Sequence, residues 1–313
     1  MKRPYRIVFM GTPEFAVPTL EALHHSRHTV AAVVTQPDRP KGRGRRRTPP
    51  PVKAAANALG HPVSQPESIK SDAFFTQMQR LGPDLFVVVA LGQILPADLL
   101  DLPPLGAINV HASLLPRLRG SAPIQWAIIN GDAETGVTTM QMDAGMDTGD
   151  ILLKAKTPIR DTDTAQSLHD RLAPMGAELL IETLEQLAAG NLRPEPQEPQ
   201  EATLAPMLSK KDGRIDWRRS AVEIDRLVRG LTPWPGAYTF CQERRLRLYR
   251  TRPLPLEAPA APGTIVQGFA DELSVATGDG VLSVLEIQGA SGKRLAVKDF
   301  LCGCDICPGH VFS

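Results

Sequence analysis

The strongest constraint on the fold is an alternation of short, continuous apolar runs with segments of helical periodicity. Residues 6–11 and 29–35 are apolar runs of strand length, and the residues between them carry apolar side chains at helical spacing. Strands that lack polar alternation are buried on both faces, which is typical of a parallel sheet covered by helices. The first part of the chain therefore predicts an α/β fold with a Rossmann-like parallel sheet, whose further strands we expect at 84–90, 106–111, 136–142 and 151–159.

The second half of the chain changes character after a long helical pattern. That pattern covers 164–190, ends in glycine and contains Pro174, which we expect to kink or break the helix. We interpret the Pro- and Glu-rich residues from about 191 as a linker. A helix is expected over 220–230, and short alternating runs then predict a small, OB-like C-terminal β-barrel with strands near 237–242, 245–250, 263–269, 272–277, 280–287 and 294–300. We therefore divide the chain into domains 1–205 and 206–313.

Charge is distributed unevenly although the net charge of the 313 residues is only +1. Residues 35–53 carry seven Lys or Arg and one Asp, and residues 204–252 carry twelve against five, so the remaining 245 residues have a net charge of −12. Two basic segments in an otherwise acidic chain indicate a polyanionic partner such as nucleic acid. Pro and Gly make the basic insertion 36–52 an irregular loop in our interpretation.

Several classes of protein are excluded by composition. The longest apolar run, 85–91, is much shorter than the roughly 18 residues of a membrane span, and the N-terminal apolar stretch is too short for a signal peptide. Four cysteines in a chain of this length do not form a disulfide framework. We therefore expect a cytoplasmic protein without a membrane partner.

Polar residues of a catalytic kind lie where two of the predicted strands end. Asn109 and His111 alternate with Val110, so both side chains point to one face of their strand, and Asp147 follows a later strand. An Asn side chain can hold a developing oxyanion, a His can stabilise or move charge near neutral pH, and an Asp can orient that His. Because no Ser or Cys nucleophile accompanies them, direct group transfer between two substrates fits better than a covalent intermediate. Taken alone, an Asn-x-His at a strand end also suits a purely structural role.

Two blocks make this segment specific. NVHASLLPRLRG (109–120) and DAGMDTGDIL (143–152) resemble the signature of the folate-dependent formyltransferases. The resemblance extends to GTPEFA (11–16), TQPDRPKGRG (35–44) and PWPGAYT (233–239), and it covers the chain from about Arg6 to Gly309.

The resemblance implies a reaction and a set of residues. It implies transfer of the formyl group of 10-formyltetrahydrofolate to the α-amino group of methionine on initiator Met-tRNA, with Asn109, His111 and Asp147 as the catalytic residues. It further implies a monomer without a metal, with the folate bound by Ser113, Leu114, Leu115 and Pro116. The tRNA acceptor arm would contact the basic insertion and the C-terminal domain through Arg43, Arg45, Arg46, Arg47, Lys210 and Lys211.

The sequence gives less support to other interpretations. Relatives in the same family act on an amino sugar or on glycinamide ribonucleotide, and the basic insertion counts against both because neither substrate needs such a charge. A non-catalytic RNA-binding relative is disfavoured because all three catalytic residues are present. An NAD-dependent dehydrogenase lacks support since GxGxxG is absent. The tail residues Cys302, Cys304, Cys307 and His310 lack the usual spacing of a zinc site.

Overall fold

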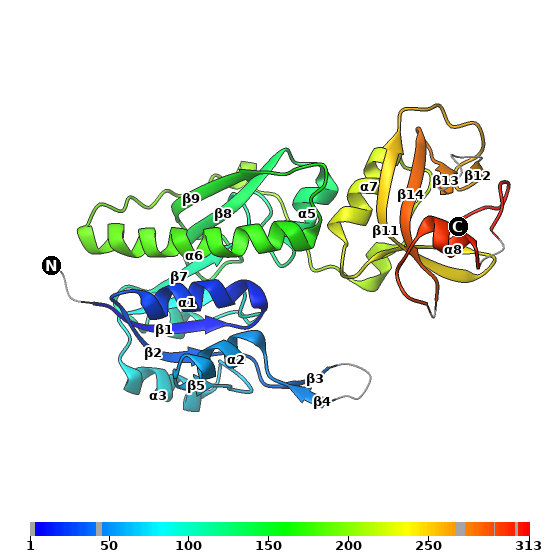
Figure 1. The fold of residues 1–313 in the computed structure, drawn as a ribbon. Coiled ribbons are helices and arrows are strands. Elements are labelled where there is room, and N and C mark those ends of the chain that lie inside the picture. The colour runs from blue at the N-terminus through cyan, green and yellow to red at the C-terminus, as the bar shows by residue number, and fades with distance from the viewer. Residues whose placement is uncertain (1–3, 42–45, 267–272, 291, 304–305) are drawn as a thin grey trace. The chain divides into compact units, whose positions relative to one another are not determined.

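The computed structural model describes residues 4–41, 46–266, 273–290, 292–303 and 306–313 (Figure 1). By their contacts these residues form two compact units. The first unit consists of Met1–Pro123, Thr135–Thr157 and His169–Ala205, and the second consists of Ile124–Glu134, Pro158–Leu168 and Pro206–Ser313. None of the helices in the described part of the chain has both the length and the hydropathy needed to cross a membrane.

The first unit is built on a seven-stranded sheet with the order β5-β2-β1-β6-β7-β8-β9. Neighbouring strands from β5 to β7 are parallel, which confirms the predicted Rossmann-like sheet. β8 departs from that prediction because it pairs with β7 in the antiparallel sense. The seven strands are β1 (Arg6–Gly11), β2 (Thr29–Val34), β5 (Val63–Ser64), β6 (Leu85–Val89), β7 (Ala107–His111), β8 (Glu134–Gln141) and β9 (Ile151–Pro158).

Helices cover both faces of this sheet. Phe74 and Met78 of α3 pack into a buried cluster with Val88 of β6 and Ala107 of β7, on the face to which Asn109 and His111 also belong by alternation. α6 covers the other face, where Gly176 lies so close to Val110 that a Cβ would come within 2.9 Å of it. The helices are η1 (Glu14–Ala16), α1 (Val17–His25), α2 (Pro51–Ala58), α3 (Asp72–Leu81), α4 (Ala97–Leu100), α6 (Ala165–Ala189) and the 3-10 turn η2 (Pro199–Glu201).

Pro174 neither ends nor divides α6, which is continuous to Ala189. The proline is exposed, so its ring lies at the surface of the helix and displaces no core side chain. The expectation of a broken helix is therefore wrong.

The basic insertion is more regular than the sequence indicates. Its described residues form two short strands, β3 (Arg39–Lys41) and β4 (Arg46–Thr48), which pair in the antiparallel sense. At the base of this hairpin Lys53 Nζ donates to Asp38 at 2.8 Å, and Gln65 donates to the same carboxylate. The hydrogen bond from Lys53 and, to a smaller extent, the one from Gln65 lower the pKa of Asp38. The interpretation of an irregular loop is wrong for these residues, because the tie at the base brings the two arms together.

The second unit contains a curled antiparallel sheet with the order β10-β11-β14-β13-β12, and β15 pairs with β14. This arrangement confirms the predicted OB-like domain. Its elements are α5 (Pro123–Asn130), η3 (Lys210–Gly213), α7 (Ala221–Gly230), β10 (Ala237–Cys241), β11 (Arg244–Leu254), β12 (Ile265–Val266), β13 (Leu273–Ala276), β14 (Val281–Gln288), β15 (Leu295–Ala296) and α8 (Val297–Leu301).

The last residues of the chain join the two outer strands of this sheet. Phe312 forms an antiparallel bridge with Cys241 of β10, and Val311 forms one with Thr264 beside β12. The prediction of a strand over 294–300 is mostly wrong, because only Leu295–Ala296 forms a strand and α8 follows it. Val297 and Phe300 are buried at a spacing of three, and Asp299 lies in the first turn, which suits a helix.

Candidate active site

The three residues expected to be catalytic meet at the end of β7. Asn109 and His111 are buried side chains on one face of this strand, and Asp147 lies in the loop between β8 and β9. Since β8 is antiparallel to β7, its carboxyl end lies beside the start of β7, where Met142 N donates to Ala107 O. The loop must therefore return toward His111 to bring Asp147 Oδ2 to 3.7 Å from His111 Nδ1.

The hydrogen bonds of His111 define the roles of its two nitrogens. Nε2 lies 3.0 Å from the carbonyl oxygen of Leu118, which can only accept, so Nε2 carries a proton. In the neutral imidazole Nδ1 would then present a lone pair to the carboxylate of Asp147. Nδ1 lies 3.7 Å from Asp147 Oδ2, beyond hydrogen-bond distance, so Nδ1 has no hydrogen-bond partner on this carboxylate.

Asp147 is held in one orientation by the backbone. Its Oδ2 accepts the N–H of Gly120 at 2.8 Å, and its φ of +56° places it in the left-handed region. Leu118, on the other side of His111, has φ of +58°. Non-glycine residues in this conformation cost free energy and persist where their surroundings fix them, typically at functional sites.

Asn109 is the one member of the trio whose side chain is free. Within the described part of the chain its amide group makes no hydrogen bond, although only 8 % of the residue is exposed. A nearly buried amide donor that the protein leaves unpartnered is suited to bind an oxygen atom of a substrate.

The residues expected to bind folate follow directly after β7. Ser113 is fully buried and its hydroxyl donates to Arg117 O at 2.7 Å. Leu115 packs with Met140 and Ile151 in a small core cluster, and Pro116 is buried as well. Of these four residues only Leu114 is partly exposed.

The structure describes only some of the residues expected to bind tRNA. Arg43 and Arg45 lie outside the described residues, and only the backbone of Arg46 is described. Arg47 is exposed on β4, while Lys210 and Lys211 are exposed on η3 of the second unit.

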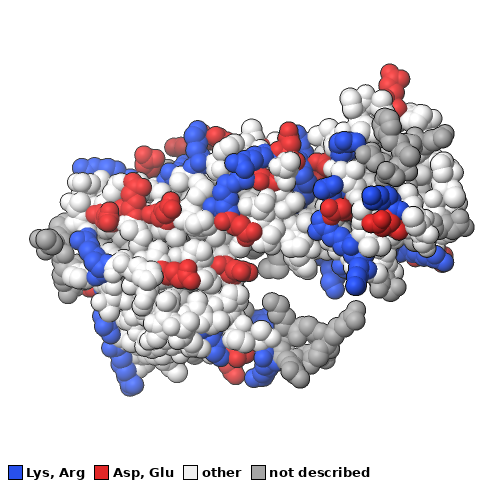
Figure 2. All heavy atoms as spheres, in the orientation of Figure 1, with Lys and Arg blue, Asp and Glu red and all other residues white. Residues whose placement is uncertain are grey.

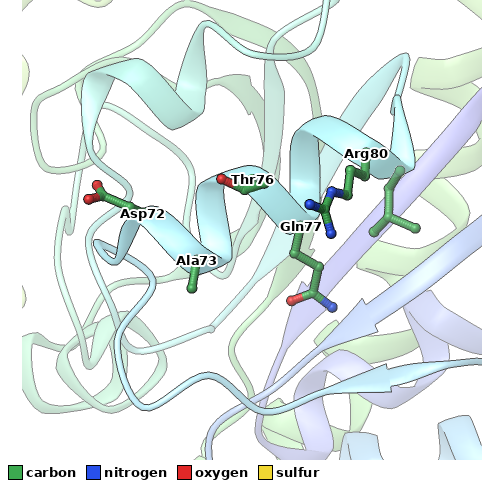
Figure 3. Close-up of a pocket in the computed structure, with 6 residues that line it drawn as sticks. Asp72, Ala73, Thr76, Gln77 and Arg80 are labelled. Carbon is green, nitrogen blue, oxygen red and sulfur yellow. The ribbon is translucent and has the colours of Figure 1, made fainter.

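Two other features do not contribute to this site. A shallow depression of about 520 Å³ is lined by side chains of α3 alone, and Figure 3 shows them along this single helix, with none of the trio among them. In the tail, Cys302 Sγ is directed at Lys298 O at 3.3 Å, and Cys304 is outside the described residues. No group of three potential metal ligands is found among the residues that the structure places.

Sequence reasoning missed the residues that support the trio. Gln197, Thr203 and Arg119 bind the loops on either side of His111, and the first two lie in the segment that we interpret as a linker. A polar residue between prolines offers no periodic signal, so only a structure could reveal this role.

Comparison with known proteins first defines the class. A family model described as formyl transferase matches residues 5–184, and one described as formyl transferase, C-terminal domain, matches residues 207–305. Among solved structures, the sugar 3N-formyl transferase WlaRD superposes with a TM-score of 0.68 at 15% identity, over 92% of this chain and 99% of that one. HypX from Aquifex aeolicus in complex with tetrahydrofolic acid gives 0.62 at 19% identity, over 96% of this chain and 47% of that one. At such identities these structures support the fold.

The curated relatives are far more similar. The methionyl-tRNA formyltransferase of Citrifermentans bemidjiense is 54% identical over 308 residues, covering 98% of this chain and 96% of its own length. The enzyme of that name from Pelobacter propionicus is 54% identical over 307 residues, with the same shares covered. The chain therefore belongs to the methionyl-tRNA formyltransferase family.

Proposed function

We propose that this enzyme transfers the formyl group of 10-formyltetrahydrofolate to the α-amino group of methionine on initiator Met-tRNA. The observation that carries the proposal is the pairing of 54% identity over nearly the whole chain with a trio of Asn109, His111 and Asp147 at the end of β7. Amino-sugar transferases share the fold at identities below 20% and are therefore a weaker guide to the acceptor. Translation begins in the cytoplasm, so the proposal places the enzyme there.

Asn109 and His111 stabilise the charge that develops during the transfer. When bound, the folate supplies a formyl carbon that the amine can attack, and negative charge then develops on the formyl oxygen. Asn109 donates to this oxygen from its unpartnered amide. The second donor is Nδ1–H of protonated His111, because Nε2 is bound to Leu118 O and Nδ1 is beyond hydrogen-bond distance of Asp147.

Asp147 stabilises the positive charge of His111 and accepts the proton that the attacking amine loses. Its carboxylate lies 3.7 Å from Nδ1, where its negative charge attracts positive charge on the ring, and it is only partly buried, so water can reach it. One hydrogen of the ammonium group formed on attack passes through such a water to the carboxylate, and the same route returns this proton to N10 of the folate as the bond between N10 and the formyl carbon breaks.

The folate lies against the loop that follows β7. Leu114, the partly exposed member of this loop, forms an apolar wall for the ring system. Ser113, Leu115 and Pro116 act mainly by fixing the loop, because Ser113 is bonded to Arg117 and Leu115 belongs to the core. No step of this reaction requires a metal ion.

The tRNA is held chiefly by charge. The basic hairpin with Arg43, Arg45, Arg46 and Arg47 contacts the acceptor end, and Lys210 and Lys211 contact phosphates from the second unit. In Figure 2 several Lys and Arg side chains gather over the second unit with Asp and Glu among them. Such mixed surfaces bind through local contacts and are sensitive to salt.

The test is transfer of labelled formyl from 10-formyltetrahydrofolate to four acceptors: initiator Met-tRNA, uncharged tRNA, free methionine and an amino-sugar nucleotide. We expect product with Met-tRNA alone, and its loss in Asn109→Ala. Product on the sugar nucleotide in place of Met-tRNA would refute the proposed acceptor and retain the formyl transferase class.

A further inference from the structure

The segment 195–205, between the end of α6 and the second unit, is bonded to both loops that flank His111. Glu195 and Ile151 exchange both backbone hydrogen bonds at 2.8 and 2.9 Å, which joins the segment to the start of β9. Further along, Thr203 O accepts from Arg119 N, and Ala205 N donates to Arg119 O. A segment bonded at both ends to the same unit is part of that unit's structure.

Gln197 is the buried centre of this segment, and its side chain uses every hydrogen-bonding position it has. Nε2 donates to Asp147 O at 2.9 Å and to Gly149 O at 2.7 Å. Oε1 accepts from Nε and Nη2 of Arg119 at 3.1 and 2.7 Å. One amide thereby connects the loop that carries Asp147 to the loop that carries Leu118 and Gly120.

Thr203 holds the second loop directly. Its Oγ1 accepts the N–H of Leu118 at 2.9 Å, and the carbonyl of Leu118 receives Nε2 of His111. Leu118 and Asp147 are both in the left-handed region, which requires external support. The bonds from Gln197 and Thr203 supply that support at the two residues that contact His111.

We propose that Gln197 and Thr203 are positioning residues of the active centre, which set the place of Asp147 and Leu118 on the two sides of His111. The inference rests on the proposed function, because its effect is measured through formyl transfer. Neither side chain touches a substrate in this account, so the expected loss is in turnover and not in substrate binding.

The first variant is Gln197→Glu, which separates the bonds that the Gln197 side chain accepts from those that it donates. A carboxylate still accepts from Arg119 but cannot donate to the carbonyl groups of Asp147 and Gly149 and repels them. We expect kcat to fall at least tenfold, with KM for Met-tRNA and for the folate within about threefold of wild type. The matched control is Gln200→Glu, the same chemical change at an exposed position of η2, which should retain wild-type kcat.

The second variant tests Thr203 at an exposed position, where loss of folding is not expected. Thr203→Val keeps the shape and removes the acceptor of Leu118 N–H, so we expect a severalfold loss of kcat. Thr203→Ser keeps the hydroxyl and should restore turnover. Equal loss in the Val and Ser variants would contradict a role for the hydroxyl group.

A double-mutant cycle distinguishes positioning from a general structural role. If Gln197 acts through Asp147, then Gln197→Glu lowers kcat in the wild type but adds little in an Asp147→Ala background. The same fold-loss in both backgrounds, or an unchanged kcat in Gln197→Glu, would overturn the inference. A wild-type protein that fails to formylate Met-tRNA would instead refute the proposed function, so the two failures are distinguishable.

Discussion

The centre around β7 and the basic hairpin of β3 and β4 are organised in opposite ways. Around His111, segments distant in sequence are joined by buried and partly buried hydrogen bonds, and two residues are held in a costly backbone conformation. In the described part of the hairpin, Asp38 and Lys53 form a tie at the base, and the side chains of Arg39 and Arg47 are exposed. If the proposed function holds, we expect geometry to limit turnover at the first region and summed charge to determine the affinity for tRNA at the second.

The largest effect is expected at Asn109. Asn109→Ala removes the unpartnered amide that we propose binds the oxyanion, so we expect kcat to fall by about 100-fold or more, while KM for Met-tRNA changes little. Steady-state formyl transfer measures both constants. Asn191→Ala, at an exposed position after α6, is the control, and a change confined to KM in Asn109→Ala would contradict the assigned role.

Changes in the hairpin should alter KM for Met-tRNA and leave kcat unchanged. Replacing Arg45, Arg46 and Arg47 by Ala removes the proposed phosphate contacts, so we expect KM for Met-tRNA to rise about tenfold with kcat unchanged at saturation. The salt dependence of KM should also become shallower, because fewer counterions are released on binding. An unchanged salt dependence would show that these arginines do not contact the tRNA.

A stability measurement sharpens the same contrast. Thr138 is fully buried, accepts the N–H of Leu115 and donates to Ser113 O at 2.7 Å. Thr138→Val leaves those groups unpaired, so we expect unfolding to become easier by about 1–3 kcal/mol. Urea unfolding gives this value, and Arg47→Ala, an exposed change, should leave it within about 0.5 kcal/mol. Equal losses in the two variants would contradict the proposed difference in organisation.

The smallest effect concerns a surface pair in the second unit. The hydrogen bond from Arg218 lowers the pKa of Asp216 to about 2. A lowered carboxylate pKa stabilises the fold above its ordinary value near 4, and this contribution is lost as the pH falls from about 4 to 2. Because both groups are exposed, the contribution is small. Unfolding of Asp216→Asn and wild type should differ slightly at pH 6 and converge at pH 2, and a difference that grows toward pH 2 would contradict this assignment.

The parts of the fold that follow a simple period could be predicted from the sequence. Continuous apolar runs indicated β1, β2, β6 and β7, and Asn109 and His111 followed from alternation on β7. Elements fixed by tertiary contacts could not be predicted: β5 has two residues, and α8 replaces an expected strand.

The site could be predicted only as far as its signature blocks. They indicated Asp147, but not the antiparallel β8 that requires its loop to return toward His111. Gln197 had no signal at all, because its role depends on four hydrogen bonds to groups 48 to 78 residues away.

The most direct test of the account is single-turnover formyl transfer at increasing concentrations of Met-tRNA, for wild type, Asn109→Ala and the triple arginine variant. The account predicts that the arginine variant reaches the wild-type rate at saturating Met-tRNA, while Asn109→Ala remains about 100-fold slower at every concentration. If the arginine variant stays equally slow at saturation, or if Asn109→Ala recovers, the division between geometry at β7 and charge at the hairpin is contradicted.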